Sequence, residues 1–219
     1  GTNAPLICDA DTGFGGLLNV HHTVKGYEDA GCSAIQMEDQ ESPKKCGHTP
    51  DRRVVPIEDM VEKIQVAVEA RSDPNFLIIA RTDSRTGLGL DEAIKRGHAF
   101  ADAGADVIFI ESPESVEELE IVGRSFEKPT LANMADGGKT PILPADQLQD
   151  MGFSVAIFPG LGMLVAAAAL ESAYRSLLKD GTSANLDTPM IGLTDMHKLM
   201  GFEEVWAFER KWARGEAAE

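Results

Sequence analysis

The chain has 219 residues, of which 43% are hydrophobic, enough to bury the core of one or two domains. It carries 20 basic and 36 acidic residues, a formal net charge of −16. Such a field repels nucleic acid and anionic membranes, so we expect neither as a partner. The three cysteines form no CxxC pair, which disfavours a disulfide framework and a zinc site and favours the cytoplasm or an organelle matrix.

Six short apolar runs bounded by turn residues predict six β-strands, and the segments between them show helical periodicity. The helical pattern is clearest at 56–71, where Pro56 opens the segment and apolar residues recur every three or four positions. Strands that alternate with helices are typical of a parallel sheet. The predicted strands are Leu6–Cys8, Ala34–Met37, Phe76–Ala80, Val107–Ile110, Thr130–Ala132 and Val155–Phe158.

Two further patterns concern helices. The tetrapeptide "SVEE" at 115–118 has the form of a capping box and predicts the start of a helix. The longest apolar run, "MLVAAAAL" at 163–170, is far below the ~20 residues that a membrane helix needs. We therefore expect it to form a helix packed against the core.

An internal repeat relates two strand ends. The segments "EDAGCSAIQMED" (28–39) and "ADAGADVIFIES" (101–112) share Asp-Ala-Gly, an isoleucine and a glutamate, and 149–160 is a weaker third copy. Each copy is typical of a helix end, a glycine in the left-handed conformation and a buried strand. The repeat makes Glu38 and Glu111 equivalent residues at the carboxyl ends of two strands.

Polar residues end five of the six predicted strands. In parallel α/β folds this end of the sheet carries the active site, which favours one shared site over a set of separate loop caps. The strand-end residues are Asp9, Asp11, Glu38, Arg81, Asp83, Glu111 and Asn133.

The pattern of strands and helices ends near residue 181 after six strands, whereas a (β/α)₈ barrel usually needs at least ~200 residues. The alternatives are an open sheet and a barrel without its first two strands, and the start of the chain almost on a strand favours the second. We therefore predict a TIM-type barrel domain over 1–181, lacking two strands, and a C-terminal helical segment over 182–219.

Two strand ends supply a cluster of carboxylates. Asp9 and Asp11 are two residues apart, so in a strand they would point the same way, toward Glu38 on the next strand. An oxygen-only set suits Mg²⁺, which takes one or two protein carboxylates together with water and substrate oxygens. From the residues alone, a metal site and a solvated acidic loop are equally good interpretations.

The stretch "KKCGH" places a thiol, Cys46, in a polar loop after Glu38. Cations next to a thiol lower its pKa and make it reactive, and Lys44, Lys45 and His48 are candidates for this role. The alternative is a solvated basic loop without chemistry. The other two cysteines flank apolar strands, which indicates structural roles.

Several motifs occur in one order between residue 5 and about residue 181: "DADTGFG", "EDQ" followed by "KKCGH", "IIARTDS", "FIES" and "LANMADGGKTP". Together they resemble the isocitrate lyase and phosphoenolpyruvate mutase superfamily, nearest its 2-methylisocitrate lyase and 2,3-dimethylmalate lyase branch. The "KKCGH" element resembles the lyases, since the phosphonate branch lacks that cysteine.

The resemblance implies a metal cofactor and an acid. Asp9 and Asp11 match the aspartates of a Mg²⁺ site that also accepts Mn²⁺, and Glu38 matches a glutamate bound to the metal directly or through water. Cys46 matches the catalytic acid.

The resemblance also implies a substrate pocket. Gly47 and His48 match residues that line a carboxylate pocket. Arg81 matches an arginine that grips a substrate carboxylate through a forked contact that lysine would not reproduce. Glu111 and Asn133 match pocket residues, and we assign Glu111 and Arg81 catalytic roles as well.

The function implied is cleavage of a 2-hydroxydicarboxylate, dimethylmalate-like or methylisocitrate-like, into an α-keto acid and a carboxylic acid. Methylisocitrate lyases carry two arginines that this chain lacks: Leu164 stands near one position and "GLTDMHKL" spans the other. Their absence favours a malate-like dicarboxylate over a tricarboxylate. The alternatives are an oxaloacetate hydrolase or decarboxylase and a non-catalytic truncated subunit. The resemblance further implies a homotetramer in which the helix within 195–212 is exchanged between subunits.

Overall fold

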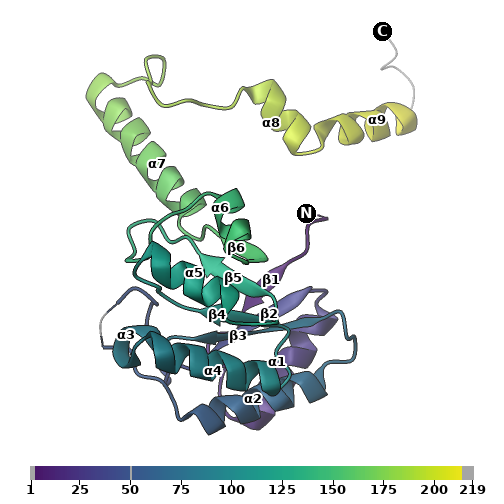
Figure 1. Ribbon diagram of the computed structural model, residues 1–219. Coiled ribbons are helices and arrows are strands. Elements are labelled where there is room, and N and C mark those ends of the chain that lie inside the picture. The colour runs from purple at the N-terminus through teal and green to yellow at the C-terminus, as the bar shows by residue number, and fades with distance from the viewer. Residues whose placement is uncertain (1–2, 50, 214–219) are drawn as a thin grey trace. The chain divides into compact units, whose positions relative to one another are not determined.

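The computed structural model describes residues 3–49 and 51–213, and its centre is one curled sheet of six parallel strands (Figure 1). The strands pair in chain order, from β1 to β6. This order is that of a (β/α)₈ barrel, which confirms the predicted fold class as a half-barrel of six strands. The strands are β1 (Ile7–Asp9), β2 (Ala34–Glu38), β3 (Leu77–Thr82), β4 (Val107–Ile110), β5 (Thr130–Asn133) and β6 (Val155–Ile157).

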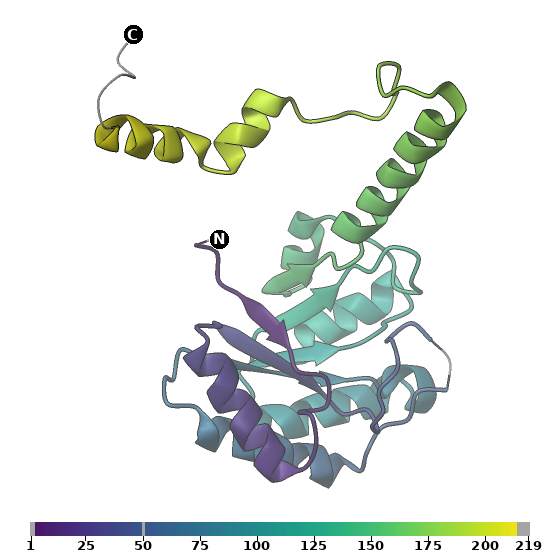
Figure 2. The same cartoon turned by 180° about the vertical axis from the view of Figure 1, so that it is seen from behind.

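Helices follow the strands, and those of the first part of the chain pack on one face of the sheet (Figure 2). Helix α5 begins as predicted, because the Ser115 hydroxyl accepts a hydrogen bond from the Glu118 amide at 3.2 Å. The helices are α1 (Leu17–Asp29), α2 (Ile57–Ala70), α3 (Arg85–Leu88), α4 (Leu90–Asp102), α5 (Val116–Arg124), α6 (Ala145–Asp150), α7 (Leu161–Asp180), α8 (Leu193–Leu199) and α9 (Phe202–Trp212).

The three copies of the internal repeat share a backbone conformation. Gly31, Gly104 and Gly152 each follow a helix and have φ values of 86°, 105° and 105°. These values lie in the region that only glycine adopts without cost, so the chain can reverse from helix to strand within a few residues. The predicted left-handed glycines are confirmed at all three positions.

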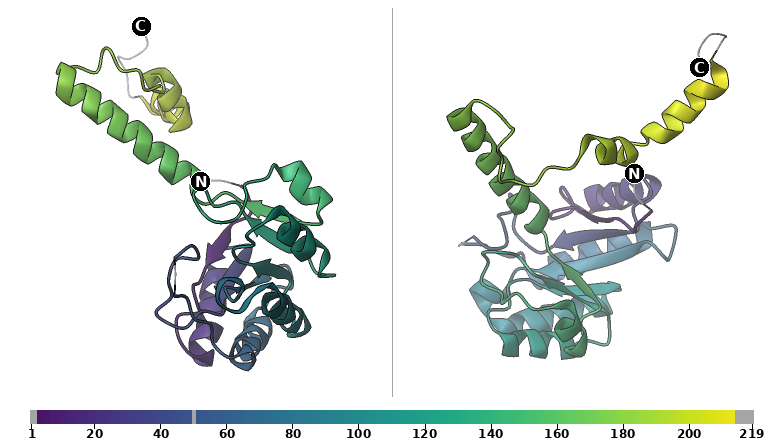
Figure 3. Two further views of the ribbon diagram at one scale, coloured as in Figure 1. Left: turned by 60° about the vertical axis from the view of Figure 1, so that its left-hand side comes forward. Right: turned by 90° about the horizontal axis from the view of Figure 1, so that it is seen from above.

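Helices lie against one side of the curled sheet, whose other side is concave (Figure 3). Successive side chains of a strand point to opposite faces, so Glu38, Arg81, Glu111 and Asn133 continue the rows that face away from the helices. Earlier along the same strands, and on the same face, lies a small apolar cluster of Ala34, Ile79, Val107, Phe109 and Leu131. The alternation thus places four predicted site residues on one surface.

Residues from 162 onward form a second compact unit. This division falls after the first residue of α7, whereas the sequence pattern predicted a boundary at 181. Within its own unit α7 has no buried residue, and the expectation that 163–170 packs against the core stays a prediction.

Among the described residues, α7 is long and apolar enough to cross a membrane, by length and composition alone. A helix that another protein chain covers passes the same test.

Candidate active site

A cavity of about 430 Å³ opens at the carboxyl ends of the strands. Its apolar wall includes Leu131 and Ile157, and its polar wall comes mostly from predicted site residues. Glu111 is buried beside it, while Asp11 and Glu38 are connected to it through Lys44. The predicted residues that line it are Asp9, Cys46, Gly47, His48, Arg81 and Asn133.

The two aspartates at the end of β1 converge for a different reason from the one predicted. The strand ends at Asp9, so strand periodicity does not continue to Asp11. Instead Oδ1 of Asp9 accepts a hydrogen bond from the Asp11 amide at 2.8 Å, and Asp11 has a φ of 49°, which aspartate tolerates. The Asp11 carbonyl accepts from the Glu38 amide at 2.8 Å, which ties this turn to β2.

Lys44 places its ammonium group among the three predicted metal ligands. Its Nζ lies 2.7 Å from Asp11, 3.6 Å from Asp9 and 3.8 Å from Glu38. Burial disfavours the charged lysine, but the hydrogen bond to Asp11 and the neighbouring charges outweigh it and raise the pKa of Lys44. Three carboxylates therefore already face one shared cation.

The Glu38 carboxylate is fully buried, and burial raises its pKa to about 7 against the opposing effect of Arg81. The Gln40 side chain donates to Oε1 at 2.9 Å, whereas Oε2 accepts no hydrogen bond in the described part of the chain. A buried carboxylate oxygen without a donor is costly. A bound cation would relieve this cost.

The donor set fits a hard divalent cation, although the described side chains are not drawn together around one. No three His, Cys, Asp or Glu side chains of residues 3–49 and 51–213 lie close enough to hold a metal ion. Mg²⁺ needs ligands at ~2.0–2.1 Å, and the carboxylates instead surround the larger ammonium group of Lys44. Metal binding therefore requires Lys44 to leave and the carboxylates to move inward.

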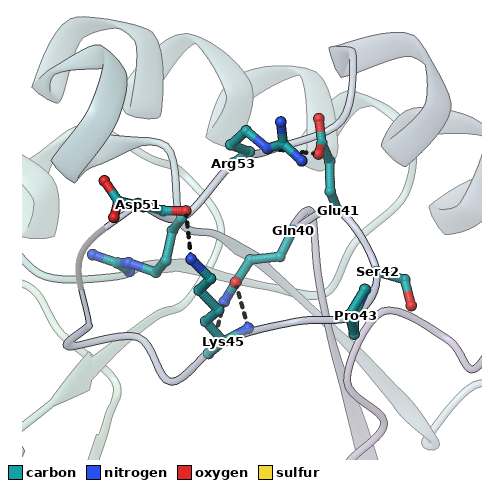
Figure 4. Close-up of a pocket in the computed structure, with 8 residues that line it drawn as sticks. Gln40, Glu41, Ser42, Pro43, Lys45, Asp51 and Arg53 are labelled. Atoms are coloured by element: carbon teal, nitrogen blue, oxygen red, sulfur yellow. Dashed lines mark hydrogen bonds and ion pairs between the residues drawn. The ribbon is translucent and has the colours of Figure 1, made fainter.

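The loop that carries the thiol is held at its start by Gln40. The side-chain amide of Gln40 accepts a hydrogen bond from the backbone N–H of Lys45 at 3.0 Å and donates one to the Lys45 carbonyl at 2.9 Å (Figure 4). The Lys45 ammonium donates to the Asp51 carbonyl at 3.2 Å, across the loop. The "EDQ" motif contains Gln40, but nothing in the sequence indicated that Gln40 would bind the backbone of the loop.

A second cavity, of about 400 Å³, lies beside Gln40 and Lys45, and it shares no lining residue with the predicted site.

Cys46 is exposed, and its carbonyl accepts hydrogen bonds from both the amide and the hydroxyl of Thr49, at 3.0 and 2.7 Å. This turn presents the thiol at the cavity wall. The two lysines beside it point elsewhere, Lys44 to the carboxylates and Lys45 to Asp51. The ammonium groups of both lysines are thus already paired with oxygen atoms of other residues.

Arg81 and Glu111 are buried side chains that contact each other at the cavity. Nη2 of Arg81 lies 3.4 Å from Glu111, and Asn133 donates to Glu111 at 3.1 Å. The His48 ring approaches Glu111 at 3.6 Å from the loop. Burial opposes the charge of Arg81, but Glu111 and Asp83 outweigh it and raise the pKa of this group. Arg81 is therefore a permanent cation aimed at the cavity.

Two glycines permit the loop to approach the strand ends. A Cβ at Gly47 would collide with the Arg81 guanidinium and lie 3.2 Å from Glu111. A Cβ at Gly138 would lie 2.8 Å from the His48 ring. Any side chain at either position would push the loop away from the cavity. This accounts for glycine in "KKCGH" and in the second position of "GGK".

Comparison with known proteins identifies the family. The family described as phosphoenolpyruvate phosphomutase matches residues 1–178. The 2,3-dimethylmalate lyase of Eubacterium barkeri is 46% identical over 96% of this chain and 73% of its own length. A 2-methylisocitrate lyase of Aeropyrum pernix is 42% identical over 91% of this chain and 64% of its own length.

Solved structures agree. A 2,3-dimethylmalate lyase superposes with a TM-score of 0.86 at 35% identity over 95% of this chain and 70% of its own. An oxaloacetate acetylhydrolase in complex with 3,3-difluorooxalacetate superposes with a TM-score of 0.87 at 31% identity, over 97% of this chain and 72% of its own. A phosphonopyruvate hydrolase in complex with oxalate and Mg²⁺ superposes with a TM-score of 0.85 at 32% identity, over 97% of this chain and 74% of its own. The chain therefore belongs to the phosphoenolpyruvate mutase and isocitrate lyase superfamily, as its motifs predicted.

Proposed function

We propose that the protein is a Mg²⁺- or Mn²⁺-dependent lyase that cleaves a carbon–carbon bond of a 2-hydroxydicarboxylate. The lyase class is supported by relatives that are named carbon–carbon lyases. One observation carries the proposal: a thiol, Cys46, and a carboxylate-binding cation, Arg81, line the same cavity. The compartment we propose is the cytoplasm or an organelle matrix, because Cys46 must stay a reduced thiol.

The residues divide the reaction between them. Arg81, held between Glu111 and Asp83, binds a substrate carboxylate and orients it, with Gly47, His48 and Asn133 lining the pocket. A bound divalent cation would stabilise the negative charge on the 2-oxygen when the 2-hydroxyl group loses its proton. The hydroxyl proton leaves to solvent, the O–H electron pair becomes the second bond of the keto C=O, and the electron pair of the broken C–C bond stays on the departing fragment. The Cys46 thiol gives its proton to that carbon, forming a C–H bond and leaving a thiolate.

The cavity favours a dicarboxylate over a tricarboxylate. Among the described residues that line it, Arg81 is the single arginine, and the two arginines of methylisocitrate lyases have no counterpart in this sequence. The test is a panel of malate, dimethylmalate, methylisocitrate, isocitrate and oxaloacetate with Mg²⁺, followed by detection of keto acid. Fastest turnover of dimethylmalate is expected. Absence of keto acid from every 2-hydroxy acid would refute the lyase proposal.

A hydrolase of oxaloacetate is a second candidate, because an oxaloacetate acetylhydrolase has the same fold over 97% of this chain. The products distinguish the two. Acetate and oxalate from oxaloacetate identify the hydrolase, whereas a keto acid and a second carboxylic acid from a malate derivative identify the lyase.

Lys44 should compete with the metal. Replacement of Lys44 by methionine removes the ammonium that now neutralises Asp9, Asp11 and Glu38, so the carboxylates should bind Mn²⁺ at least ten times more tightly, a difference of about 1.4 kcal/mol. Titration of Mn²⁺ by electron paramagnetic resonance measures this. Lys45→Met, which removes the same charge one residue away, is the control. Equal Mn²⁺ affinities of the two variants would contradict the assignment.

The apolar side chains of α8 and α9 should be covered by another subunit. Leu199, Phe202, Val205, Trp206 and Phe208 are between 39% and 72% exposed, which marks an interaction surface. We therefore propose a homotetramer in which these helices are exchanged between subunits. Light scattering should give four times the chain mass at micromolar concentration, and a monomer would count against the proposal.

A further inference from the structure

One buried carboxylate joins two arginines beside the cavity. Asp83, whose side chain is fully buried, accepts from Nε and Nη2 of Arg81, both at 2.9 Å, so that the two groups form a fork. The same carboxylate accepts from Nη1 of Arg52 at 2.6 Å. The side chains of Arg81 and Arg52 are 10% and 3% exposed. Buried, charge-assisted contacts of this kind are strong and hold their geometry.

Arg52 belongs to the segment that follows the thiol loop. Its second nitrogen, Nη2, donates to the Thr86 hydroxyl at 2.5 Å, so Arg52 is anchored both to the residue that follows β3 and to α3. Gln40 holds the start of the same loop through Lys45. The loop that presents Cys46 is thus fastened at both ends, and the fastening at its far end is the carboxylate that also grips Arg81.

The backbone of Asp83 is held in place by a buried network around Asp39. Its amide donates to Asp39 at 2.9 Å, and the Asp39 carboxylate accepts from Arg96 at 2.9 Å and from the Thr82 hydroxyl at 2.7 Å. All of these side chains are buried. A change at Asp83 would therefore be transmitted to its two arginines, since the strand end behind it cannot adjust.

The fork decides where Arg81 points. Two other carboxylates, Glu111 and Glu38, lie 3.4 and 3.5 Å from its guanidinium, longer than the contacts to Asp83. Arginine has five N–H donors, and the fork uses two of them. If Asp83 were neutral, Arg81 would turn toward the other two carboxylates and lose its alignment with the cavity.

We infer that Asp83 is a positioning residue that aligns Arg81 for the substrate carboxylate and, through Arg52, couples this alignment to the loop that carries Cys46. This inference rests on the proposed lyase function for its substrate. The coupling to the loop is a property of the chain alone and can be measured without turnover.

The experiment compares Asp83→Asn and Arg52→Gln with two controls in the Mg²⁺-loaded protein. Asp106→Asn removes an equivalent carboxylate at the other end of β3, where Asp106 pairs with Arg71 and accepts from the Ile78 amide at 2.9 Å. Arg53→Gln removes an arginine whose side chain is 79% exposed. Kinetics with the best substrate of the panel and the rate of Cys46 alkylation by iodoacetamide are the two readouts.

Asp83→Asn should raise KM at least tenfold, and both Asp83→Asn and Arg52→Gln should speed alkylation of Cys46 severalfold, while the two controls change neither. A wild-type KM and a wild-type alkylation rate in both variants would overturn the inference. If Asp83→Asn does not fold, Arg52→Gln decides: faster alkylation supports the coupling, and an unchanged rate assigns Asp83 a structural role only. If the wild type cleaves no substrate, the lyase proposal fails while the alkylation result still judges the coupling.

Discussion

Replacement of Cys46 by serine should lower kcat by about 10²–10⁴-fold, because it removes a positioned general acid. The substitution keeps the shape of the side chain. It exchanges a thiol, whose ordinary pKa is ~8.5, for a hydroxyl, which is a far weaker acid. The departing carbanion would then find no proton donor of suitable strength at the cavity wall, where Cys46 lies.

The KM of this variant should stay within about twofold of the wild-type value, since the serine change leaves the groups that bind the substrate in place. Arg81 keeps its contacts with Asp83 and Glu111, and the carboxylates at the end of β1 are not touched. A steep fall in kcat with a nearly constant KM therefore separates proton donation from binding. Wild-type kcat in Cys46→Ser would show that the loop only binds carboxylate.

Cys32→Ser makes the same chemical change elsewhere and is the matched control. Cys8 and Cys32 are partly buried, with their sulfur atoms 2.9 Å apart, and burial together with Cys32 raises the pKa of Cys8 to about 11. Neither thiol lines the cavity. Cys46 is exposed, so one equivalent of iodoacetamide should label it first, and a bound dicarboxylate should protect it.

Local sequence signals predicted the elements well. Gly31, Gly104 and Gly152 were recognised because a positive φ at a helix end demands glycine, and Ser115 because a capping hydroxyl acts within one helical turn. The predicted strands lie within two residues of the observed ones at each end, since apolar runs between turn signals leave little freedom. These sequence signals depend on residues that are neighbours in the chain and not on tertiary contacts.

The roles of the site residues stay predictions, but the structure shows which of these residues it brings together and which contacts the sequence did not indicate. Cys46, Arg81 and Asn133 line one cavity, as expected from parallel strands that bring their carboxyl ends together. The direction of Lys44 and the grip of Gln40 on the loop were missed. Both depend on how a long loop folds back over the sheet, which no periodicity encodes. Arg52 and Asp83 were missed as a pair for the same reason, since 31 positions separate them.

The second large effect is expected at the carboxylates at the end of β1. Asp11→Asn keeps the size of the side chain but removes the charge that lies closest to Lys44, at 2.7 Å. Loss of even an outer-shell partner costs ~10–100-fold in metal affinity, so if Asp11 is a direct ligand, as proposed, its loss should weaken Mn²⁺ binding by more than ~100-fold. Metal-dependent turnover should fall accordingly at fixed Mg²⁺ concentration.

The fold should survive this change, because Asp11 is partly exposed and its removal lessens the repulsion among three carboxylates. Thermal unfolding and Mn²⁺ titration are measured together, with Asp150→Asn, an exposed acid at the end of α6, as the control for net charge. An excess of Mn²⁺ should restore part of the activity of Asp11→Asn, since only affinity is lost. Unchanged Mn²⁺ affinity in Asp11→Asn, or full activity of the wild type after treatment with a chelator, would refute the metal site, and Lys44 would then be a structural counter-ion of the acidic cluster.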